Sequence, residues 1–449
     1  MLDATTKLDI LHVTYTYFPD PSGGTEVYVR GLARQLRAHG HMTAVAAPSS
    51  ASAAYMESDL PVYRFQADPH ARIDLAYGAV DEIAAENFNA IIERTKPRIV
   101  HLHARTAAVS ERLIDIAHAV GAIVIFTYHT PTASCTRGTM MLFGERPCDG
   151  RIDTKRCTTC GISALGVPRP IARLVASAPA ALSVLATTLK SNSRPLSALR
   201  IPGLMVSDQR RFLAFIQKVD HVVAVSQWVN DVLTRNAVPG KKITLSPQGI
   251  GVSAPSLRQP LSRDRAGPLK IGYFGRLGWA KGPDLLARAL SLIPEIDVQV
   301  DVFAIRGATV PDRDYAYLED HARSDRRLCL RAAVAPENVL GSMSDYDLIA
   351  IPSRWLETGP LVALEAFAAN VPVLGANLGG IAELVRNGID GILLPPDDPK
   401  AWAEAIKELA GDRSAIDRLR ARINRPRSIA DAADDMIKLY AEMTARQLQ

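Results

Sequence analysis

The chain has 449 residues, a length that excludes a single simple core, given roughly one domain per 150 residues. Hydrophobic residues make up 47% and charged residues 22%, an ordinary balance for a globular protein. The formal net charge of +5 permits an anionic partner without requiring one. Because this charge is small and aromatic residues do not alternate with the basic ones, we do not expect nucleic-acid binding.

The amino terminus predicts no secretory signal, because Asp3, Lys7 and Asp9 stand where an apolar signal core would lie. The best candidate for a membrane span is residues 174–189. It is shorter than the ~20 residues that a spanning helix needs, and Pro179 interrupts it. We therefore expect a cytoplasmic protein without a transmembrane helix.

The first half of the chain alternates buried strands with amphipathic helices, a pattern that predicts parallel βαβ units. Strands are predicted at 8–14, 43–47, 98–102, 123–127, 220–225 and 243–246, and helices at 25–39, near 110–120 and from about 227. Ligands of parallel sheets bind beyond the carboxyl ends of the strands. Gly23 and Gly24, which end the first loop, and His129, which follows the strand at 123–127, are candidate binding residues. The alternatives are a plain turn and a structural histidine.

Four of the five cysteines fall in one segment: Cys135, Cys148, Cys157 and Cys160. The last two form a C-x-x-C pair, in which two thiolates three residues apart can bind one tetrahedral metal ion. The first spacing is wider than in most zinc knuckles, so free thiols and a redox pair are alternative interpretations. We predict a structural zinc site that holds the loop after His129. The fifth cysteine, Cys329, is expected to be an ordinary buried thiol.

Residues 164–218 form a helical, basic stretch with a single acid, Asp208. Its basic residues are Arg169, Arg173, Lys190, Arg194, Arg200, Arg210, Arg211 and Lys218. Apolar runs beside these charges favour an interfacial surface that contacts a membrane. The alternative is a solvated helix face.

Residues 251–268 are rich in Pro, Ser, Gly and charge, and they predict a linker. We place this linker at 256–268, after a first domain of residues 1–255. A second βα series follows, with strands predicted at 270–274, 298–304, 328–332, 347–352 and 371–376. The sequence therefore predicts two α/β domains joined by one polar linker.

The segment 352–391 carries the strongest functional signal. Gly359 and Pro360 predict the start of a helix, so Glu357 is expected in the loop before it and Glu365 inside it. The free N–H groups and partial positive charge of a helix N-terminus bind anions. A phosphate held there would have a carboxylate on each side, an arrangement that suits a sugar nucleotide.

Two cations follow the strand at 270–274, in the sequence GRLGWAKGPD. Arg276 and Lys281 precede a helix predicted from Pro283, at the edge of the sheet where ligands bind. Two cations beside a helix N-terminus suit a diphosphate. The alternative is that they are solvated loop charges.

Taken together, these motifs resemble those of the retaining nucleotide-sugar glycosyltransferases of family four. Members of this family have the GT-B fold, with two Rossmann-like α/β domains facing a central cleft. The family's E-x7-E element matches Glu357 to Glu365. Its surroundings match as well, with PS at 352–353, VPV at 371–373 and a Gly pair at 379–380.

Two further elements are similar to loops of the family. GRL…KG at 275–282 resembles its phosphate loop, and Gly23-Gly24 its amino-terminal glycine loop. His129, followed by Cys135 and a later C-x-x-C pair, resembles one subgroup. Two departures stand out: Pro360 has no N–H to donate, and Asn370 replaces a common glycine, although Asn tolerates the left-handed conformation.

The resemblance implies roles for the second domain, which would be the nucleotide-sugar-binding domain at 269–425. Arg276 and Lys281 would hold the donor diphosphate, and Glu357 would contact the transferred sugar. Glu365 would bind the ribose hydroxyls. The backbone of the segment that includes Gly359, Leu361 and Val362 would receive phosphate oxygens.

The resemblance also implies roles for the first domain. His129 would contact the donor sugar near the reacting carbon, and Gly23 and Gly24 would let this domain close over the phosphates. The last helix, at 426–449, would return to the first domain. Family members generally need no divalent metal for catalysis.

We therefore predict a glycosyltransferase that moves a sugar, with retention, from a UDP- or GDP-sugar to an acceptor hydroxyl. The acceptor is expected to be a saccharide or lipid-linked saccharide of cell-envelope polysaccharide synthesis, at the inner face of the cytoplasmic membrane. Because the sequence offers no clear protein nucleophile, same-face attack guided by the phosphate is favoured. The alternatives are a sugar-nucleotide epimerase of the same architecture and a non-catalytic regulator that binds nucleotide sugars.

Overall fold

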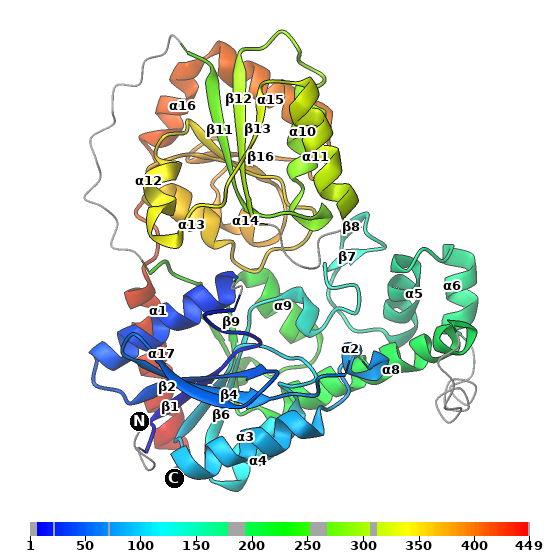
Figure 1. The fold of residues 1–449 in the computed structure, drawn as a ribbon, viewed down its shortest axis with the longest axis vertical. Coiled ribbons are helices and arrows are strands. Elements are labelled where there is room, and N and C mark those ends of the chain that lie inside the picture. The colour runs from blue at the N-terminus through cyan, green and yellow to red at the C-terminus, as the bar shows by residue number, and fades with distance from the viewer. Residues whose placement is uncertain are drawn as a thin grey trace. The chain divides into compact units, whose positions relative to one another are not determined.

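The computed structural model describes residues 7–20, 23–70, 72–177, 194–251, 267–305 and 312–447. The chain forms two compact units, one of Met1–Pro247 with Ile429–Gln449 and the other of Gln248–Ser428. In each unit a largely parallel sheet is covered by helices (Figure 1). The predicted linker at 256–268 falls almost wholly on residues outside the described ranges.

The first unit is built on an eight-stranded sheet with the order β10-β9-β6-β5-β1-β2-β4-β3. Its strands are β1 (Ile10–Val13), β2 (Thr43–Ser49), β3 (Ala53–Glu57), β4 (Leu60–Gln66), β5 (Ile99–Leu102), β6 (Ile123–Tyr128), β9 (His221–Ala224) and β10 (Ile243–Leu245). All neighbours are parallel except β3 and β4, which form an antiparallel hairpin. The chain order reverses at β1, which lies between β2 and β5, so the crevice for a ligand is expected beyond these strands.

Helices of the first unit either cover the two faces of this sheet or project beside it. They are α1 (Gly24–Ala38), α2 (Ile73–Ala76), α3 (Glu82–Thr95), α4 (Glu111–Ala119), α5 (Thr154–Ala164), α6 (Arg169–Ala176), α8 (Arg194–Lys218), α9 (Gln227–Arg235) and α17 (Ile429–Gln447). One apolar core joins the strands to α3, α4, α8 and α9, and a second joins them to α1 and α17. The C-terminal helix α17 therefore packs in the first unit, where Met436 and Tyr440 share a core with Tyr28 and Leu32 of α1.

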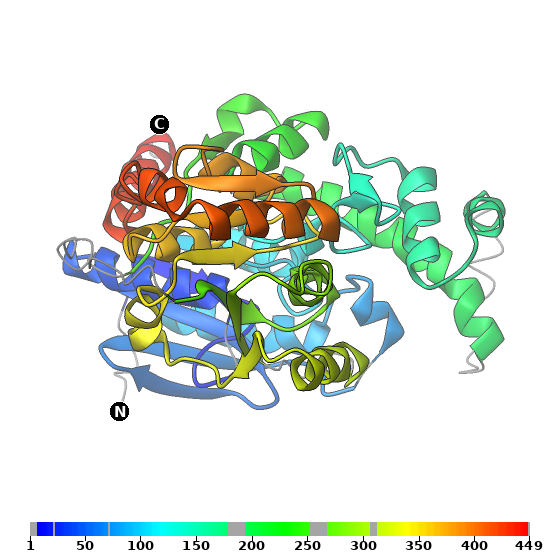
Figure 2. The same ribbon diagram turned by 90° about the horizontal axis from the view of Figure 1, so that it is seen from above.

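Three helices form a projection beside the first sheet. Figures 1 and 2 both show α5, α6 and the amino-terminal part of α8 extending away from the strands. Ile162 of α5, Ala172 of α6 and Met205 of α8 form a small core of their own. This projection contains most of the predicted basic stretch.

Part of the basic stretch is paired with acids from elsewhere in the unit. Lys218 contacts Asp115 at 2.7 Å, and Asp208 pairs with Arg105 at 2.8 Å, outside the stretch. Lys190 and most of the predicted apolar segment 174–189 lie outside the described residues. Among the described residues, no helix combines the length and the apolar character needed to cross a membrane.

The second unit has a fully parallel six-stranded sheet with the order β13-β12-β11-β14-β15-β16. Its strands are β11 (Leu269–Arg276), β12 (Val298–Ile305), β13 (Leu328–Arg331), β14 (Leu348–Ile351), β15 (Val373–Ala376) and β16 (Gly391–Leu394). Its helices are α10 (Pro283–Leu290), α11 (Asp312–Ser324), α12 (Val339–Met343), α13 (Leu361–Ala368), α14 (Gly379–Leu384), α15 (Pro399–Gly411) and α16 (Arg413–Arg420). The chain order reverses at β11, which lies between β12 and β14.

The predicted elements are present with small shifts at their ends. Helix α13 begins at Leu361, one residue later than predicted, because Pro360 has an extended backbone and acts as the N-cap. Asn370 has φ +56°, the left-handed conformation that its side chain tolerates. The sequence analysis assigned nothing to residues 48–97, which contain the β3–β4 hairpin and α3, nor to β16.

Candidate functional site

The loop after β11 places both predicted cations of the second unit. Arg276 is the last residue of β11, and Lys281 ends a short 3-10 turn (Trp279–Lys281) just before α10. Between them and the helix stands Gly282, with φ +70°. A Cβ atom at this position would lie 2.1 Å from the carbonyl oxygen of Pro352, so only glycine lets this loop lie against the segment after β14.

Lys281 contacts Glu357 directly, with 2.7 Å between Nζ and Oε1. Glu357 is buried, and the same oxygen accepts hydrogen bonds from Ser353 Oγ at 2.8 Å and Trp355 Nε1 at 2.7 Å. The Lys281 ammonium also lies 5.0 Å from the centre of the Trp355 ring. These donors hold the Glu357 side chain in one orientation.

Arg354, which the sequence analysis did not single out, ties the same two loops together. Its guanidinium is buried and donates to both carboxylate oxygens of Asp284, at 2.6 and 2.7 Å. It also donates to Asp397 at 2.9 Å and to the carbonyl oxygen of Trp279 at 3.0 Å. A bidentate fork of this kind fixes geometry as well as charge. A single basic residue in the loop after β14 is not by itself a signal of this role.

The N-terminus of α13 follows the Glu357 loop. Gly359 stands before the N-cap, and a Cβ atom there would meet Gln248 Oε1 at 2.9 Å. The first two residues of α14, Gly379 and Gly380, pack against the backbone of the same loop, where added Cβ atoms would clash with Leu356 to Thr358. Leu361 and Val362 are the first two residues of α13, so their N–H groups belong to the free donors of its first turn.

Glu365 lies one turn further along α13. Its side chain is half-buried and has no hydrogen bond or ion pair within the described residues. Burial raises the pKa of this carboxyl to about 7. A half-buried acid without a protein partner is able to accept hydrogen bonds from a ligand.

Arg276 differs from Lys281 in having no ion pair with any described residue. Its side chain is exposed at the carboxyl end of β11, and the Tyr273 hydroxyl donates to its carbonyl oxygen at 2.6 Å. The second unit therefore brings Lys281 and Glu357 into contact and places Arg276 at the end of the strand that leads to Lys281. Glu365 lies in the helix that follows Glu357.

In the first unit, the predicted glycines stand at the start of α1. Gly23 is the N-cap and Gly24 the first helical residue. The Gly23 N–H donates to Glu26 Oε2 at 2.8 Å, and Glu26 is buried. This contact satisfies one of the free N–H groups at the helix start.

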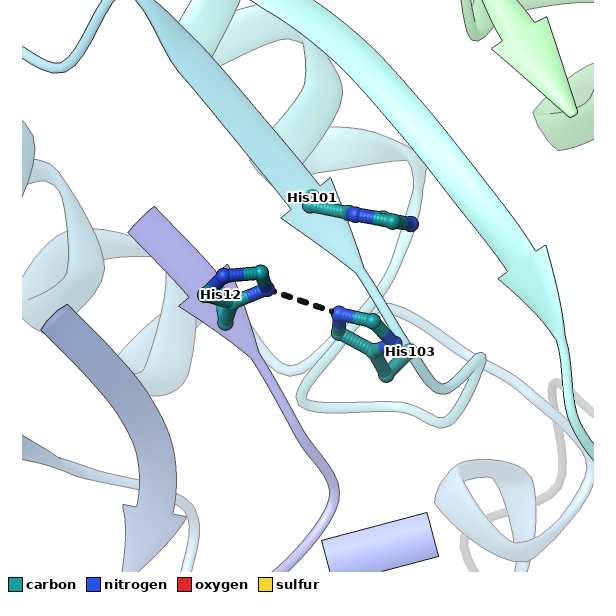
Figure 3. A group of neighbouring side chains, drawn as sticks. All are labelled: His12, His101 and His103. Carbon is teal, nitrogen blue, oxygen red and sulfur yellow. Dashed lines mark hydrogen bonds between the residues drawn. The ribbon is translucent and has the colours of Figure 1, made fainter. Parts of the chain in front are cut away.

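His129 is the end of a hydrogen-bonded chain of buried histidines. Its Nε2 lies 3.0 Å from Nδ1 of His103, and His103 Nε2 lies 3.0 Å from Nδ1 of His12 (Figure 3). A fourth ring, His101, lies tilted against His103 with 4.1 Å between the ring centroids, and it hydrogen-bonds Tyr440 of α17. The sequence analysis found only His129; the H-x-H pattern at the end of β5 was the available signal for its neighbour.

Burial keeps these imidazoles neutral. It lowers the pKa of His12 and of His129 to about 3, and the pKa values of His101 and His103 also fall well below the ordinary value. His12, His101 and His103 each offer one nitrogen within 4.8 Å of the others, the spacing of a metal-ligand group. However, Thr127 and Tyr440 engage both nitrogens of His101, at 2.6 Å each. The arrangement is therefore best described as a hydrogen-bonded network.

The four clustered cysteines line one cavity of the first unit and form no disulfide. Within the described residues, no three of their sulfur atoms lie within 4.8 Å of one another. The lone Cys329 is half-buried on β13, less enclosed than predicted.

Sequence comparison assigns both units to known families. Residues 268–412 match the model for glycosyl transferases group 1, and residues 22–149 match the model for glycosyltransferase family 4. Each unit carries a glycosyltransferase domain. The two matches together cover more than half of the chain and confirm the predicted enzyme class.

Curated relatives agree with this class. The D-inositol 3-phosphate glycosyltransferase of Xylanimonas cellulosilytica is 28% identical over 279 residues, which are 58% of this chain and 66% of the relative. The glycogen synthase of Mycobacterium tuberculosis is 31% identical over 222 residues, which are 48% of this chain and 51% of the relative. The chain thus spans about two thirds of the first relative and about half of the second.

Solved structures show that the glycosyltransferase domains adopt the GT-B fold. The sucrose-phosphate synthase of Thermosynechococcus elongatus is 18% identical with a TM-score of 0.66, over 98% of this chain and all of that protein. The Anabaena protein HepE in complex with UDP-glucose is 16% identical with a TM-score of 0.63, over 97% of this chain and 100% of that protein. The predicted fold of two Rossmann-like domains is confirmed.

Proposed function

We propose that the chain is a retaining glycosyltransferase that transfers a hexosyl group from a UDP- or GDP-sugar to an acceptor hydroxyl. The observation that carries this proposal is the fixed Lys281–Glu357 pair. Its carboxylate, Glu357, stands in the loop just before the N-terminus of α13. This arrangement combines a cation, a buried carboxylate and free helix N–H groups on adjoining segments. A donor with a diphosphate and a polyhydroxyl group needs all three.

The proposed chemistry places negative charge on the departing nucleoside diphosphate. Lys281 and Arg276 would neutralise this charge, and the N–H groups of Leu361 and Val362 would donate to phosphate oxygens. Arg276 is suited to this role because its guanidinium is exposed and makes no ion pair with a described residue. Fixed donors that need no rearrangement lower the barrier most.

Glu357 and Glu365 would recognise hydroxyl groups of the donor. Glu357 is held rigidly by three donors, as a carboxylate that orients the transferred sugar must be. Glu365 would accept hydrogen bonds from the ribose, replacing the solvation that burial has removed. The fold also occurs in the Anabaena protein HepE in complex with UDP-glucose and in a starch synthase of Arabidopsis thaliana bound to ADP and acarbose.

For the first unit, we assign to His129 a contact with the transferred sugar near the reacting carbon. As a neutral imidazole fixed by His103, it would donate or accept one hydrogen bond without adding charge. Gly23 and Gly24 would allow close approach of the α1 backbone to the donor phosphates. Retention is proposed to proceed by same-face attack of the acceptor hydroxyl, guided by the phosphate as it leaves, with no divalent metal needed for catalysis.

The proposed acceptor is a saccharide or lipid-linked saccharide of cell-envelope polysaccharide synthesis, reached at the inner face of the cytoplasmic membrane. Three large apolar side chains on and before α6 support a peripheral contact: Leu165 is 55% exposed, Ile171 52% and Leu174 75%. The exposed Arg169 and Arg173 lie on the same helix. Apolar side chains interspersed with arginines suit an anionic lipid surface.

The test is a panel of nucleotide sugars screened by thermal shift, followed by nucleotide release with candidate acceptors. A donor that binds the folded chain raises its melting temperature. A transferase releases nucleoside diphosphate only when an acceptor is present in useful amounts, and the sugar keeps its anomeric configuration in the product. An epimerase would convert the sugar nucleotide without release, and a regulator would bind it without turnover; either result would contradict the proposal.

A further inference from the structure

We infer that Cys135, Cys148, Cys157 and Cys160 form a tetrahedral binding site for one zinc ion in the first unit. The four thiols line a single cavity of about 30 Å³, which has room for one ion. They come from two parts of the chain, because Cys135 and Cys148 bracket the loop after β6, whereas Cys157 and Cys160 lie on α5. An ion would therefore join a loop to a helix. This inference does not depend on the proposed transferase activity.

The two segments present their sulfur atoms in ways that suit a metal. Cys157 and Cys160 are three residues apart on α5, so they share one face of the helix. The backbone N–H of Phe143 donates to the sulfur of Cys160 at 3.1 Å, and the N–H of Gly150 hydrogen-bonds the sulfur of Cys148. Backbone donors of this kind orient thiolate ligands and stabilise their charge.

The charges around the cavity complement a four-thiolate site. Three arginines line it: Arg137, Arg151 and Arg156. Arg156 is paired with Asp149 at 2.6 Å, and the Cys148 thiol donates to the same carboxylate at 3.7 Å. Four thiolates and one Zn²⁺ carry a net charge of about −2, which Arg137 and Arg151 would help to offset.

The backbone of the loop also indicates that it is held at defined points. Met140 and Phe143 adopt positive φ angles of 53° and 55°, which are costly for residues with side chains. Gly150 has φ +73°, and a Cβ atom there would lie 2.3 Å from Val232 Cγ2. The only ladder that the structure describes within this loop pairs two-residue strands, β7 (Met141–Leu142) and β8 (Arg146–Pro147), too little to hold a conformation alone. Asn236 of the segment after α9 also holds the loop, through the carbonyl oxygen of Gly150 at 2.9 Å, and a metal ion would add a further constraint.

The alternative of a disulfide-linked pair is not met in the structure, in which all four cysteines are free. The sulfur atoms stand further apart than metal ligands do, so binding would draw them together by side-chain rotation to Zn–S distances of about 2.3 Å.

The experiment measures zinc in the full chain, purified under reducing conditions without chelator, by inductively coupled plasma mass spectrometry. We expect about one zinc per chain. Cys157→Ser/Cys160→Ser should lose most of this zinc, whereas the matched control Cys329→Ser should retain it. Absence of zinc from the wild-type chain, or equal zinc in both variants, would overturn the inference.

A second measurement covers the case in which the double variant does not fold. The wild-type chain is stripped with chelator and titrated with Co²⁺, which gives an intense thiolate-to-cobalt charge-transfer band when several thiolates bind one ion. We expect this band, together with a melting temperature that falls on chelation and recovers with zinc. A stripped chain that gives no band, or that melts at an unchanged temperature, would reject the site, as would disulfides found by alkylation and mass spectrometry.

Discussion

In both units the first strand of the sheet, β1 or β11, lies beside a strand from later in the chain, β5 or β14, and the candidate site residues gather near the ends of these strands. The two groups of side chains differ in charge. In the first unit they are buried, neutral rings, His12, His103 and His129, bonded to one another. In the second they are charged groups, with Lys281 paired to Glu357.

This difference shows that a shared backbone layout does not fix the electrostatics of the crevice. The histidines of the first unit are buried, and burial favours their neutral form. In the second unit, Lys281 keeps part of its side chain in solvent, with 26% exposed, and meets its counter-ion at 2.7 Å. The candidate residues are therefore charged in the second unit and neutral in the first.

The largest expected effect comes from removing the cation of the second unit. Lys281→Ala should lower kcat/KM for transfer by about 10²–10³-fold, because one donor aimed at the developing charge is lost. The matched control is Lys407→Ala. The Lys407 side chain is exposed, and its ion pair with Glu295 is long, at 3.9 Å. Turnover is measured as released nucleoside diphosphate, with melting temperatures to verify folding. Wild-type turnover in Lys281→Ala would show that the charged crevice is not the donor site.

A smaller effect is expected on the pH dependence of stability in the first unit. The folded-state pKa of His12, about 3, lies below its ordinary value of 6.5, so the unfolded state binds more protons between these values. The resulting stability is complete above about pH 6.5 and is lost as the pH falls. His12→Gln should reduce this pH dependence by up to about 1.4 kcal/mol per pH unit, measured by urea unfolding. The exposed His70→Gln is the control, and an equal change in both variants would refute a buried neutral His12.

The smallest expected effect is on the pH dependence of stability in the second unit, where stability falls as the pH rises. The folded-state pKa of Glu365, about 7, lies above its ordinary value of 4.5, so its contribution to stability is complete below about pH 4.5 and lost as the pH rises through 7. Glu365→Gln should remove a loss on the order of 2 kcal/mol between about pH 5 and 8. The control is the exposed Glu404→Gln. If stability of the Glu365→Gln variant depends on pH as strongly as that of the wild type, the Glu365 carboxyl is exposed to water and the prediction is wrong.

Much of the fold was accessible from sequence patterns. Strands with nearly continuous apolar runs, such as 123–127 and 371–376, were predicted close to their observed bounds, because a strand buried on both faces has few polar positions. The β3–β4 hairpin was missed, since its edge strand β3 is largely exposed and carries no such run. The short strand β16 was missed as well.

The candidate site was accessible where chemistry and spacing coincide. Glu357, Glu365, Arg276 and Lys281 were identified from residue types placed at strand ends and a helix start. The hydrogen-bond partners of these residues were not identified. Ser353 and Trp355 donate to Glu357 only because of the path that the loop after β14 follows. No sequence spacing distinguishes them from other polar loop residues.

The amino-acid sequence by itself determined the alternation of strands and helices, the glycines that permit tight loops and the positions of charged groups at strand ends. These follow from local rules, since apolar periodicity and backbone freedom act over a few residues. Only the tertiary structure decided that Arg354 would join two loops through Asp284 and that three distant histidines would form a buried chain of hydrogen bonds. Such contacts depend on strand order, which brings residues about 90 positions apart to one edge, as with His12 and His103.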